Sequence, residues 1–332
     1  MTRRYLMFVL LAAFAAPRPQ ASAQAQAPQL NKATPTSLTN APLTHLGIVV
    51  PDIQRVARGY ADLWGGAVPE IKTISLEMTD GKKADARVAY VPLPNFYLEI
   101  LQPVTKAGAL HDHLQKFGLG IHHLGVGIDS NIDGVRAELV SKDGRWTGGV
   151  KGGTWAFVDL RHTPLGTTIE IGPTARPAMP PAPTEQTGLF GGRPLAHIGW
   201  ANSDVQASLE KLAQIFGRDY SSPRRYPPEG PFPFPPNMPW TKQGWVQTIM
   251  VQSANNIGME LVQGMGGPNP WEAHIQKQKG TSLMHIAVGR GNIPRDEWLR
   301  IGQAKGGKWT NGGPESTFAY LDWTDTLGLV IE

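Results

Sequence analysis

Two short runs of sequence decide how the chain folds: Leu43-Thr44-His45-Leu46-Gly47-Ile48-Val49-Val50 and, further on, Leu195-Ala196-His197-Ile198-Gly199-Trp200. Each run is strand-like and contains one histidine. Eight residues after each histidine, apolar or small residues begin to recur at steps of 0, 3, 4, 7, 10 and 11, starting at Ile53 and Val205. That spacing is typical of one face of an amphipathic helix. Because the same strand and helix pattern occurs twice, it indicates an internal duplication.

The later parts of the two halves also correspond. Residues 121–127 match residues 283–289, and two further matches join 145–149 with 308–312 and 154–159 with 317–322. Within each half, the stretch from its second histidine loosely repeats the opening plan. The chain therefore consists of four modules, each a strand, a helix and further strands, which predicts an α+β fold.

Composition divides the chain into five segments. A signal and a flexible lead-in precede the first domain, and a Pro-rich linker separates it from the second. A further Pro-rich run, residues 223–240, is inserted into the third module. The predicted boundaries are 1–23 for the signal peptide, 24–40 for the lead-in, 41–172 for the first domain, 173–192 for the linker and 193–332 for the second domain.

The chain has 332 residues and no cysteine. This excludes disulfides, iron–sulfur clusters, thiolate zinc sites and a cysteine nucleophile, so any metal must be held by histidines and carboxylates. Apolar residues make up 41% of the chain and charged residues 17%. That balance supplies enough apolar material for sizeable cores and excludes wholesale disorder.

The N-terminus has the features of a secretory signal peptide. Arg3 and Arg4 precede an apolar run over residues 5–16, and Ala21-Ser22-Ala23 forms a small-residue cleavage site. The apolar run is too short for a stable membrane span, with an uncleaved anchor as the alternative interpretation. Residues 2–6 also resemble a twin-arginine signal, so two export routes stay open. We predict a periplasmic or secreted protein with no membrane span in its mature form.

Removal of the signal changes the charge balance. The formal net charge is +4, and loss of Arg3, Arg4 and Arg18 lowers it to +1. The mature chain has no cluster of Lys and Arg interleaved with aromatic residues, so nucleic acid is not an expected partner. We expect a small-molecule substrate and a monomer or homodimer.

Two histidines and two glutamates occupy equivalent positions in each half. The second histidine of each half precedes the last glutamate of that half by 47 residues in both cases. A carboxylate in an apolar strand is costly to bury unless it is paired or binds a metal, although a lone Glu facing solvent is the simpler interpretation of any one position. The full set is His45, Glu99, His123 and Glu170 in the first half, and His197, Glu260, His285 and Glu332 in the second.

Two histidines and two carboxylates leave two open positions on an octahedral cation. Such a donor set favours a divalent transition metal, namely Fe, Mn, Co, Ni or Zn, over an all-oxygen calcium site. Other histidines fit less well. We expect His111, Asp112 and His113 at the surface, and His122 on the strand face opposite to His123.

The residues carry a resemblance to a known family. The His-Leu/Ile-Gly strands, the Leu-Glu-Ile-Leu-Gln-Pro run at residues 98–103, the run at residues 120–124 and the final Ile-Glu strand resemble the vicinal oxygen chelate superfamily, most closely its glyoxalase I and methylmalonyl-CoA epimerase branch. The resemblance implies four βαβββ modules paired into two cups, each with a metal held by the four ligands of its site. The cups form either from modules 1+2 and 3+4 or from modules 1+4 and 2+3, and both groupings leave the ligands the same.

The resemblance also implies a function. The expected chemistry is that of a metal-dependent isomerase, epimerase or lyase, which chelates a small substrate through vicinal oxygens and stabilises an enolate or enediolate. Glu170 and Glu99 are the expected catalytic bases of the first cup, with Glu332 and Glu260 in the same roles in the second. Because Glu332 ends the sequence, we expect the second site to be the more frayed of the two.

Two other functions stay open. An Fe(II) extradiol-type ring-cleavage dioxygenase needs only two histidines and one carboxylate, and a non-catalytic binding protein like those of bleomycin resistance needs no metal ligands. The eight candidate metal ligands, four in each half, favour the isomerase or lyase interpretation.

Overall fold

The computed structural model describes residues 30–183, 188–226, 245–265, 269–289, 291–312 and 318–332. The predicted signal peptide and most of the Pro-rich insertion lie outside these residues. No helix within them is long and apolar enough to cross a membrane.

The first half forms one eight-stranded sheet in the order β2-β3-β4-β1-β5-β8-β7-β6. Its strands are β1 (Leu43–Val49), β2 (Lys72–Glu77), β3 (Lys83–Pro92), β4 (Tyr97–Pro103), β5 (Gly120–Gly127), β6 (Arg145–Gly148), β7 (Ala156–Asp159) and β8 (Thr168–Gly172), with helices α1 (Ile53–Trp64), α2 (Ala109–Phe117) and α3 (Ile132–Ser141).

The second half repeats this order as β10-β11-β12-β9-β13-β16-β15-β14. Its strands are β9 (Leu195–Ala201), β10 (Arg224–Tyr226), β11 (Trp245–Gln252), β12 (Gly258–Met265), β13 (Ser282–Val288), β14 (Lys308–Asn311), β15 (Tyr320–Asp322) and β16 (Val330–Ile331), with helices α4 (Val205–Phe216), α5 (Pro270–Gln278) and α6 (Arg295–Ala304).

Each sheet is a curled cup made from two consecutive modules. In the first, β1 pairs in parallel with β4 and antiparallel with β5, while β5 pairs in parallel with β8. The second half has the same pairings among β9, β12, β13 and β16. The α+β fold of two cups is therefore confirmed, and the cups are built from modules 1+2 and 3+4.

The two predicted amphipathic helices form where the sequence places them. Asp52 accepts a hydrogen bond from the backbone N–H of Arg55, and Gly65 ends α1 in the left-handed region at φ 74°. Asp204 and Gly217 cap α4 in the same way. Side-chain caps and terminal glycines satisfy backbone groups that a helix end would otherwise leave unpaired.

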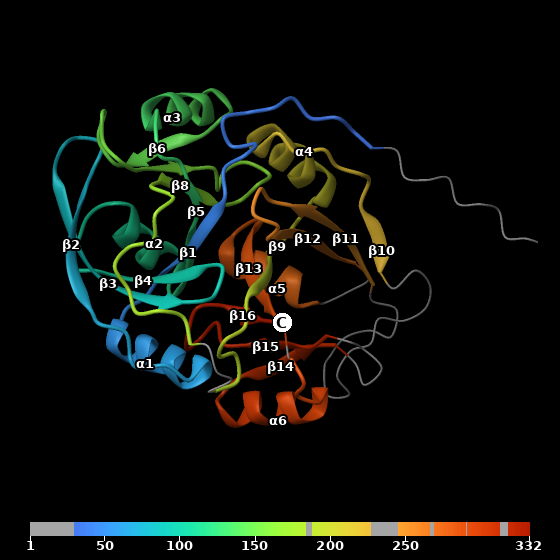
Figure 1. Cartoon of the computed structure of the whole chain (residues 1–332). Coiled ribbons are helices and arrows are strands. Elements are labelled where there is room, and N and C mark those ends of the chain that lie inside the picture. Colours follow the sequence, from blue (N-terminus) through green and yellow to red (C-terminus); the bar gives the residue numbers. More distant parts are fainter. Residues whose placement is uncertain (1–29, 184–187, 227–244, 266–268, 290, 313–317) are drawn as a thin grey trace, which may run out of the picture.

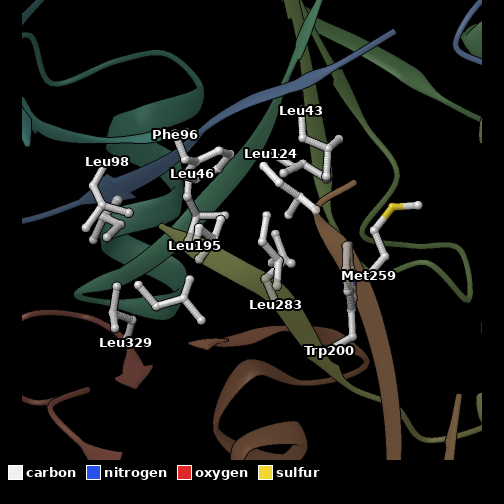
Figure 2. Packing of buried hydrophobic residues seen from close by; sticks show 14 of the residues in the cluster. Leu43, Leu46, Phe96, Leu98, Leu124, Leu195, Trp200, Met259, Leu283 and Leu329 are labelled. Carbon is white, nitrogen blue, oxygen red and sulfur yellow. The ribbon is translucent and has the colours of Figure 1, made fainter. Parts of the chain in front are cut away.

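One hydrophobic core joins the two halves. The outer faces of the two sheets pack against each other, and Figure 2 shows Leu46 and Leu124 of the first half close to Leu195 and Leu283 of the second. Helices α1, α3, α4 and α6 lie at the periphery, whereas α2 and α5 contact smaller clusters on the inner faces (Figure 1). The inner faces thus remain available for a site.

Two asparagine side chains tie each half to the first residue of the other half's histidine strand. Asn95, just before β4, donates to the Leu195 carbonyl at 2.9 Å and accepts from its N–H at 2.8 Å. Asn255, just before β12, makes the equivalent pair of bonds with Leu43, at 2.8 and 3.2 Å. The start of each histidine strand is therefore held by the opposite half.

Two connecting segments are more ordered than their composition suggests. Residues 30–40 of the predicted flexible lead-in contact the second half, where Asn31 forms a bridge with Tyr220 and Thr36 donates to the Ile215 carbonyl at 2.9 Å. The end of the predicted linker packs into the core, where Phe190 lies against Trp64 and Trp298. Residues 30–40 of the predicted lead-in thus make specific contacts with the second half.

Candidate metal centres

Four neighbouring strands of the first cup bring the predicted residues of that half together. His45 lies on β1, Glu99 on β4, His123 on β5 and Glu170 on β8, and one ligand atom from each lies within 4.8 Å of the others. The Nε2 atoms of the two histidines are 3.1 Å apart. Glu99 Oε2 lies 3.2 Å from His123 Nε2, and Glu170 Oε2 lies 3.1 Å from it.

The second cup brings its four residues together in the same way. His197, Glu260, His285 and Glu332 come from β9, from β12, from β13 and from the residue after β16, again within 4.8 Å of one another. The two Nε2 atoms are 3.2 Å apart. Glu332 Oε2 is 3.0 Å from His197 Nε2, and Glu260 Oε2 is 3.1 Å from His285 Nε2.

Small residues beside each histidine make this convergence possible. Across the first sheet, Gly47 lies directly opposite His123, and Gly125 lies opposite His45. A Cβ atom at either glycine would overlap the imidazole opposite it. Gly199 has the same relation to His285, while Ala287 lies opposite His197. A glycine or alanine two residues after each histidine therefore makes room for the ring on the neighbouring strand, and three of the four histidine strands have the His-x-Gly spacing.

Burial and the neighbouring side chains shift the pKa values of these histidines and glutamates in opposite directions. Burial lowers the pKa of His123, but hydrogen bonds to Glu170 and Glu99 outweigh burial and raise the pKa to about 9. The same balance with Glu260 and Glu332 raises the pKa of His197 to about 10. Burial raises the pKa of Glu170, yet His45 and His123 hold it well below its usual range. In each cluster a protonated histidine therefore balances the glutamates, and a bound cation would take over that positive charge.

The ligand spacing suits a divalent cation. A cation with ligand bonds of about 2.1 Å places neighbouring ligand atoms about 3.0 Å apart at right angles and about 3.4 Å apart at tetrahedral angles. In the first cup the Nε2–Oε2 distances range from 3.1 Å to 3.8 Å, and in the second from 3.0 Å to 3.5 Å. All four histidines present Nε2 to the centre, so the residues present fit a metal ion.

Outer contacts orient the first cup's histidines. Thr44 Oγ1 lies 2.9 Å from His45 Nδ1, and His122 Nδ1 lies 2.9 Å from His123 Nδ1. Such partners fix the ring orientation of a ligating histidine. In the second cup Met284 occupies the position of His122, and His285 Nδ1 has no hydrogen-bond partner among the described residues. The two centres therefore differ outside their ligands.

Two predictions about other histidines are wrong. A bulge in β5 leaves His122 as an extra residue between His123 and Ile121, so its ring lies on the same side as that of His123, and both rings contact Phe157. His113 is not a surface residue, because it is 2% exposed and its ring contacts His122. His111 is half-buried and Asp112 is exposed.

Glu332 is better anchored than its position at the end of the sequence suggests. Its N–H donates to the Ile286 carbonyl, and its carbonyl accepts from the Val288 N–H, both at 2.9 Å. These bonds continue the pairing of β16 with β13. The expectation of a frayed second site is therefore wrong.

Three tyrosines and a threonine beside the clusters were missed by the sequence analysis. Tyr90 is the register partner of Glu99, and Tyr97 stacks on His45 with 4.8 Å between ring centroids. In the second cup Thr248 Oγ1 donates to Glu260 at 3.2 Å, and Tyr320 Oη lies 3.5 Å from His285 Nε2. Burial and then nearby glutamates raise the pKa of all three tyrosines, so each stays a protonated donor. Alternation along the ligand strand for Tyr97, and along the strands next to a ligand strand for the other three, is the signal that could have found them.

A cavity opens beside the second cluster. It has a volume of about 280 Å³ and is lined by Glu260 and Glu332 together with apolar and aromatic side chains such as Val262 and Tyr320. A small molecule in this cavity would lie directly against the carboxylates of the cluster.

The glycines give a direct test of the two centres. We expect Gly47→Ala to displace the His123 ring, to lower stability by about 1–3 kcal/mol as overpacking does, and to abolish metal binding in the first cup only. Gly199→Ala should do the same in the second cup. Metal content per chain and thermal unfolding measure both effects. Gly289→Ala is the matched control, because a Cβ there meets nothing within 4 Å; unchanged metal content in both cup variants would contradict the prediction.

Comparison with known proteins agrees with this architecture. Residues 44–158 match the family described as the glyoxalase/bleomycin resistance protein/dioxygenase superfamily. Over 128 residues, 38% of this chain and 68% of the relative, the sequence is 27% identical to the mitochondrial methylmalonyl-CoA epimerase of Homo sapiens. A triple mutant of 4-hydroxymandelate synthase from Streptomyces coelicolor has a similar fold, with a TM-score of 0.53 and 16% identity over 80% of this chain and 76% of that one. Residues 44–158 are therefore identified as a domain of the glyoxalase/bleomycin resistance protein/dioxygenase superfamily, and the second half of the chain repeats the strand order of the first.

Proposed function

We propose that the chain is an exported metal-dependent enzyme that acts on a small substrate with vicinal oxygens by enolate or enediolate chemistry. The observation that carries this proposal is the convergence of two histidine nitrogens and two glutamate oxygens in each cup. A divalent transition metal bound there would act as a Lewis acid and stabilise the negative charge that develops on substrate oxygens. Four protein ligands would leave an octahedral ion two open positions for the two oxygens of a substrate.

The residues of the second cup divide into two roles. Thr248 donates to Glu260 Oε1 at 3.2 Å and thereby fixes the direction of that carboxylate, which suits a pure ligand. Both glutamates line the cavity, and Glu332, whose Oε2 lies 3.0 Å from His197 Nε2, would have the second role of removing a proton from the carbon next to the substrate carbonyl. In the first cup Glu170, the structural counterpart of Glu332, has the same role, with Glu99 as the other candidate base.

The cavity size favours a small substrate. Its volume of about 280 Å³ lies at the lower end of ligand pockets, which hold about 300–1,000 Å³. An epimerase is among the relatives, and proton removal next to a carbonyl is the step that epimerisation requires. A small oxygenated acid, ketone or aromatic fits the described cavity better than an acyl-CoA, and it also agrees with export.

Ring cleavage by a dioxygenase is the second candidate. The structural likeness to 4-hydroxymandelate synthase concerns the fold. A two-histidine, one-carboxylate iron site leaves three positions open for substrate and oxygen. The fourth ligand in each cup removes one of those positions, which favours the isomerase or lyase proposal. A binding protein without turnover would not need metal ligands, so two complete ligand sets favour an enzyme.

Metal analysis tests the double centre. We expect two divalent transition-metal ions per wild-type chain and one ion in each of the variants His45→Ala and His197→Ala, because each removes one ligand of a separate cluster. Mass-spectrometric metal analysis after equilibration with Mn, Fe, Co, Ni or Zn measures this. A wild-type chain that retains none of these metals would refute the centre and favour a binding protein.

Proton exchange tests the reaction. With metal-loaded protein, we expect NMR to detect exchange of solvent deuterium into the carbon next to the carbonyl of a 2-oxo acid or α-hydroxy ketone. Glu332→Gln should reduce the exchange rate of the second cup about 10²-fold or more, and Glu170→Gln should do the same for the first cup. The reason is that general acid–base catalysis contributes about 10²–10⁴-fold. The metal content of both variants is measured as well, because only a variant that keeps its metal tests the glutamate as a base. Oxygen consumption with a catechol, and no exchange with any ketone, would instead support the dioxygenase.

Export has its own test. The proposal rests on Arg3 and Arg4, the apolar run and the small residues at 21–23. When the full chain is expressed in a bacterium, we expect periplasmic protein whose first residue is Gln24. Replacing Arg3 and Arg4 by Lys should block export if the twin-arginine route is used and leave it unchanged if the general secretory route is used. Full-length protein retained in the cytoplasm of the wild-type strain would contradict export.

A further inference from the structure

A second cavity lies where the two halves meet, outside both metal clusters. Its volume is about 280 Å³, and it is bounded by the β7–β8 loop, the end of α2 and the segment between α5 and β13. A Cβ atom at Gly166 would collide with the backbone of Thr281, so the two halves approach closely here. The lining is rich in cationic side chains: Lys116, Arg145, Arg161 and Lys279, with His162 beside them.

The cations of this cavity are not balanced by the chain itself. Asp159 is the one carboxylate of the lining, and Arg161 binds both of its oxygens at 2.9 Å. Within the described part of the chain, Lys116, Arg145 and Lys279 form no ion pair with a carboxylate. Three positive charges therefore face a cavity without a negative partner.

The second half contains the same arrangement with a carboxylate built in. Lys277 and Lys308 both bind Asp325, at 3.4 and 2.9 Å. Their hydrogen bonds hold the pKa of Asp325 below its usual range. One carboxylate thus bridges two cations that come from a helix and from an edge strand.

The residues correspond position by position. Lys116 and Lys277 are the eighth residues of α2 and α5, two helices of nine residues each. Arg145 and Lys308 are the first residues of β6 and β14, and they pair with Asp159 and Asp322 in the neighbouring strand. Three residues after those aspartates, the first half has His162 where the second half has Asp325. The first half therefore has the two corresponding cations but a histidine at the position of the carboxylate.

We propose that the cavity between the halves binds a small, doubly charged oxyanion, such as a phosphate group, in the place that Asp325 takes in the second half. Lys116 and Arg145 would hold it as Lys277 and Lys308 hold Asp325, and Lys279 adds a third charge that favours a dianion over a carboxylate. His122 and His113 also line this cavity, and His122 contacts the metal-ligand candidate His123. The site is therefore a neighbour of the first metal centre, although its existence does not depend on the proposed reaction.

An exchange of residues between the two halves tests the site. Metal-free, desalted protein is titrated with inorganic phosphate by calorimetry at low ionic strength. We expect one phosphate per wild-type chain, with acetate at least tenfold weaker. His162→Asp should supply the missing carboxylate and weaken phosphate binding at least tenfold. The reciprocal Asp325→His should create a second phosphate site in the other half.

The control and the decisive variants use exposed side chains. The double variant Lys116→Gln/Arg145→Gln should lose at least tenfold in phosphate affinity, whereas the matched Lys277→Gln/Lys308→Gln should bind phosphate as the wild type does. Circular dichroism verifies that each variant is folded. Where His162→Asp is not folded, the two double variants test the proposal instead. Absence of phosphate binding to the wild type, acetate binding as tight as phosphate, or equal losses in both double variants would overturn the proposal.

Discussion

Two imidazole rings can meet over a β-sheet only where the strands beneath them carry almost no side chain. In the first cup, Gly47 and Gly125 provide that space, each lying directly opposite the histidine of the neighbouring strand. The two parallel neighbours, β4 and β8, then bring one glutamate each to the same point. The position of each cluster thus follows from the register of four central strands. The helices outside each cup and the small hydrophobic clusters under α2 and α5 pack against these strands and stabilise that register.

The two cups are not independent units. Their outer faces share one core, and each half uses an asparagine to hold the first residue of the other half's histidine strand. Phe190 from the connecting segment is buried between helices of both halves. The first residue of β1 and that of β9 are therefore each positioned by a side chain of the opposite half. The described parts of the segments before and between the cups add contacts of their own, through Thr36 and Phe190.

Sequence spacing predicted the module plan, the two amphipathic helices and all eight residues that the structure brings together, because duplicated spacing reports duplicated structure. It failed where one residue changes the local geometry. A single extra residue in β5 turns His122 to the side of His123, and alternation along a strand cannot reveal such a bulge. His113 lies in a polar segment, yet α2 packs inside the cup and buries it. The anchoring of Glu332 depends on backbone bonds to β13, which no side-chain pattern records.

The difference between His162 and Asp325 has a consequence for how such a chain can evolve. Histidine and aspartate codons differ only in their first base, so one base substitution in one copy separates a neutralised ion cluster from an uncompensated one. Both arrangements are present in one molecule, so each half serves as a reference for the other. Comparison of the two halves therefore shows where their side-chain chemistry has diverged while their strand order has not.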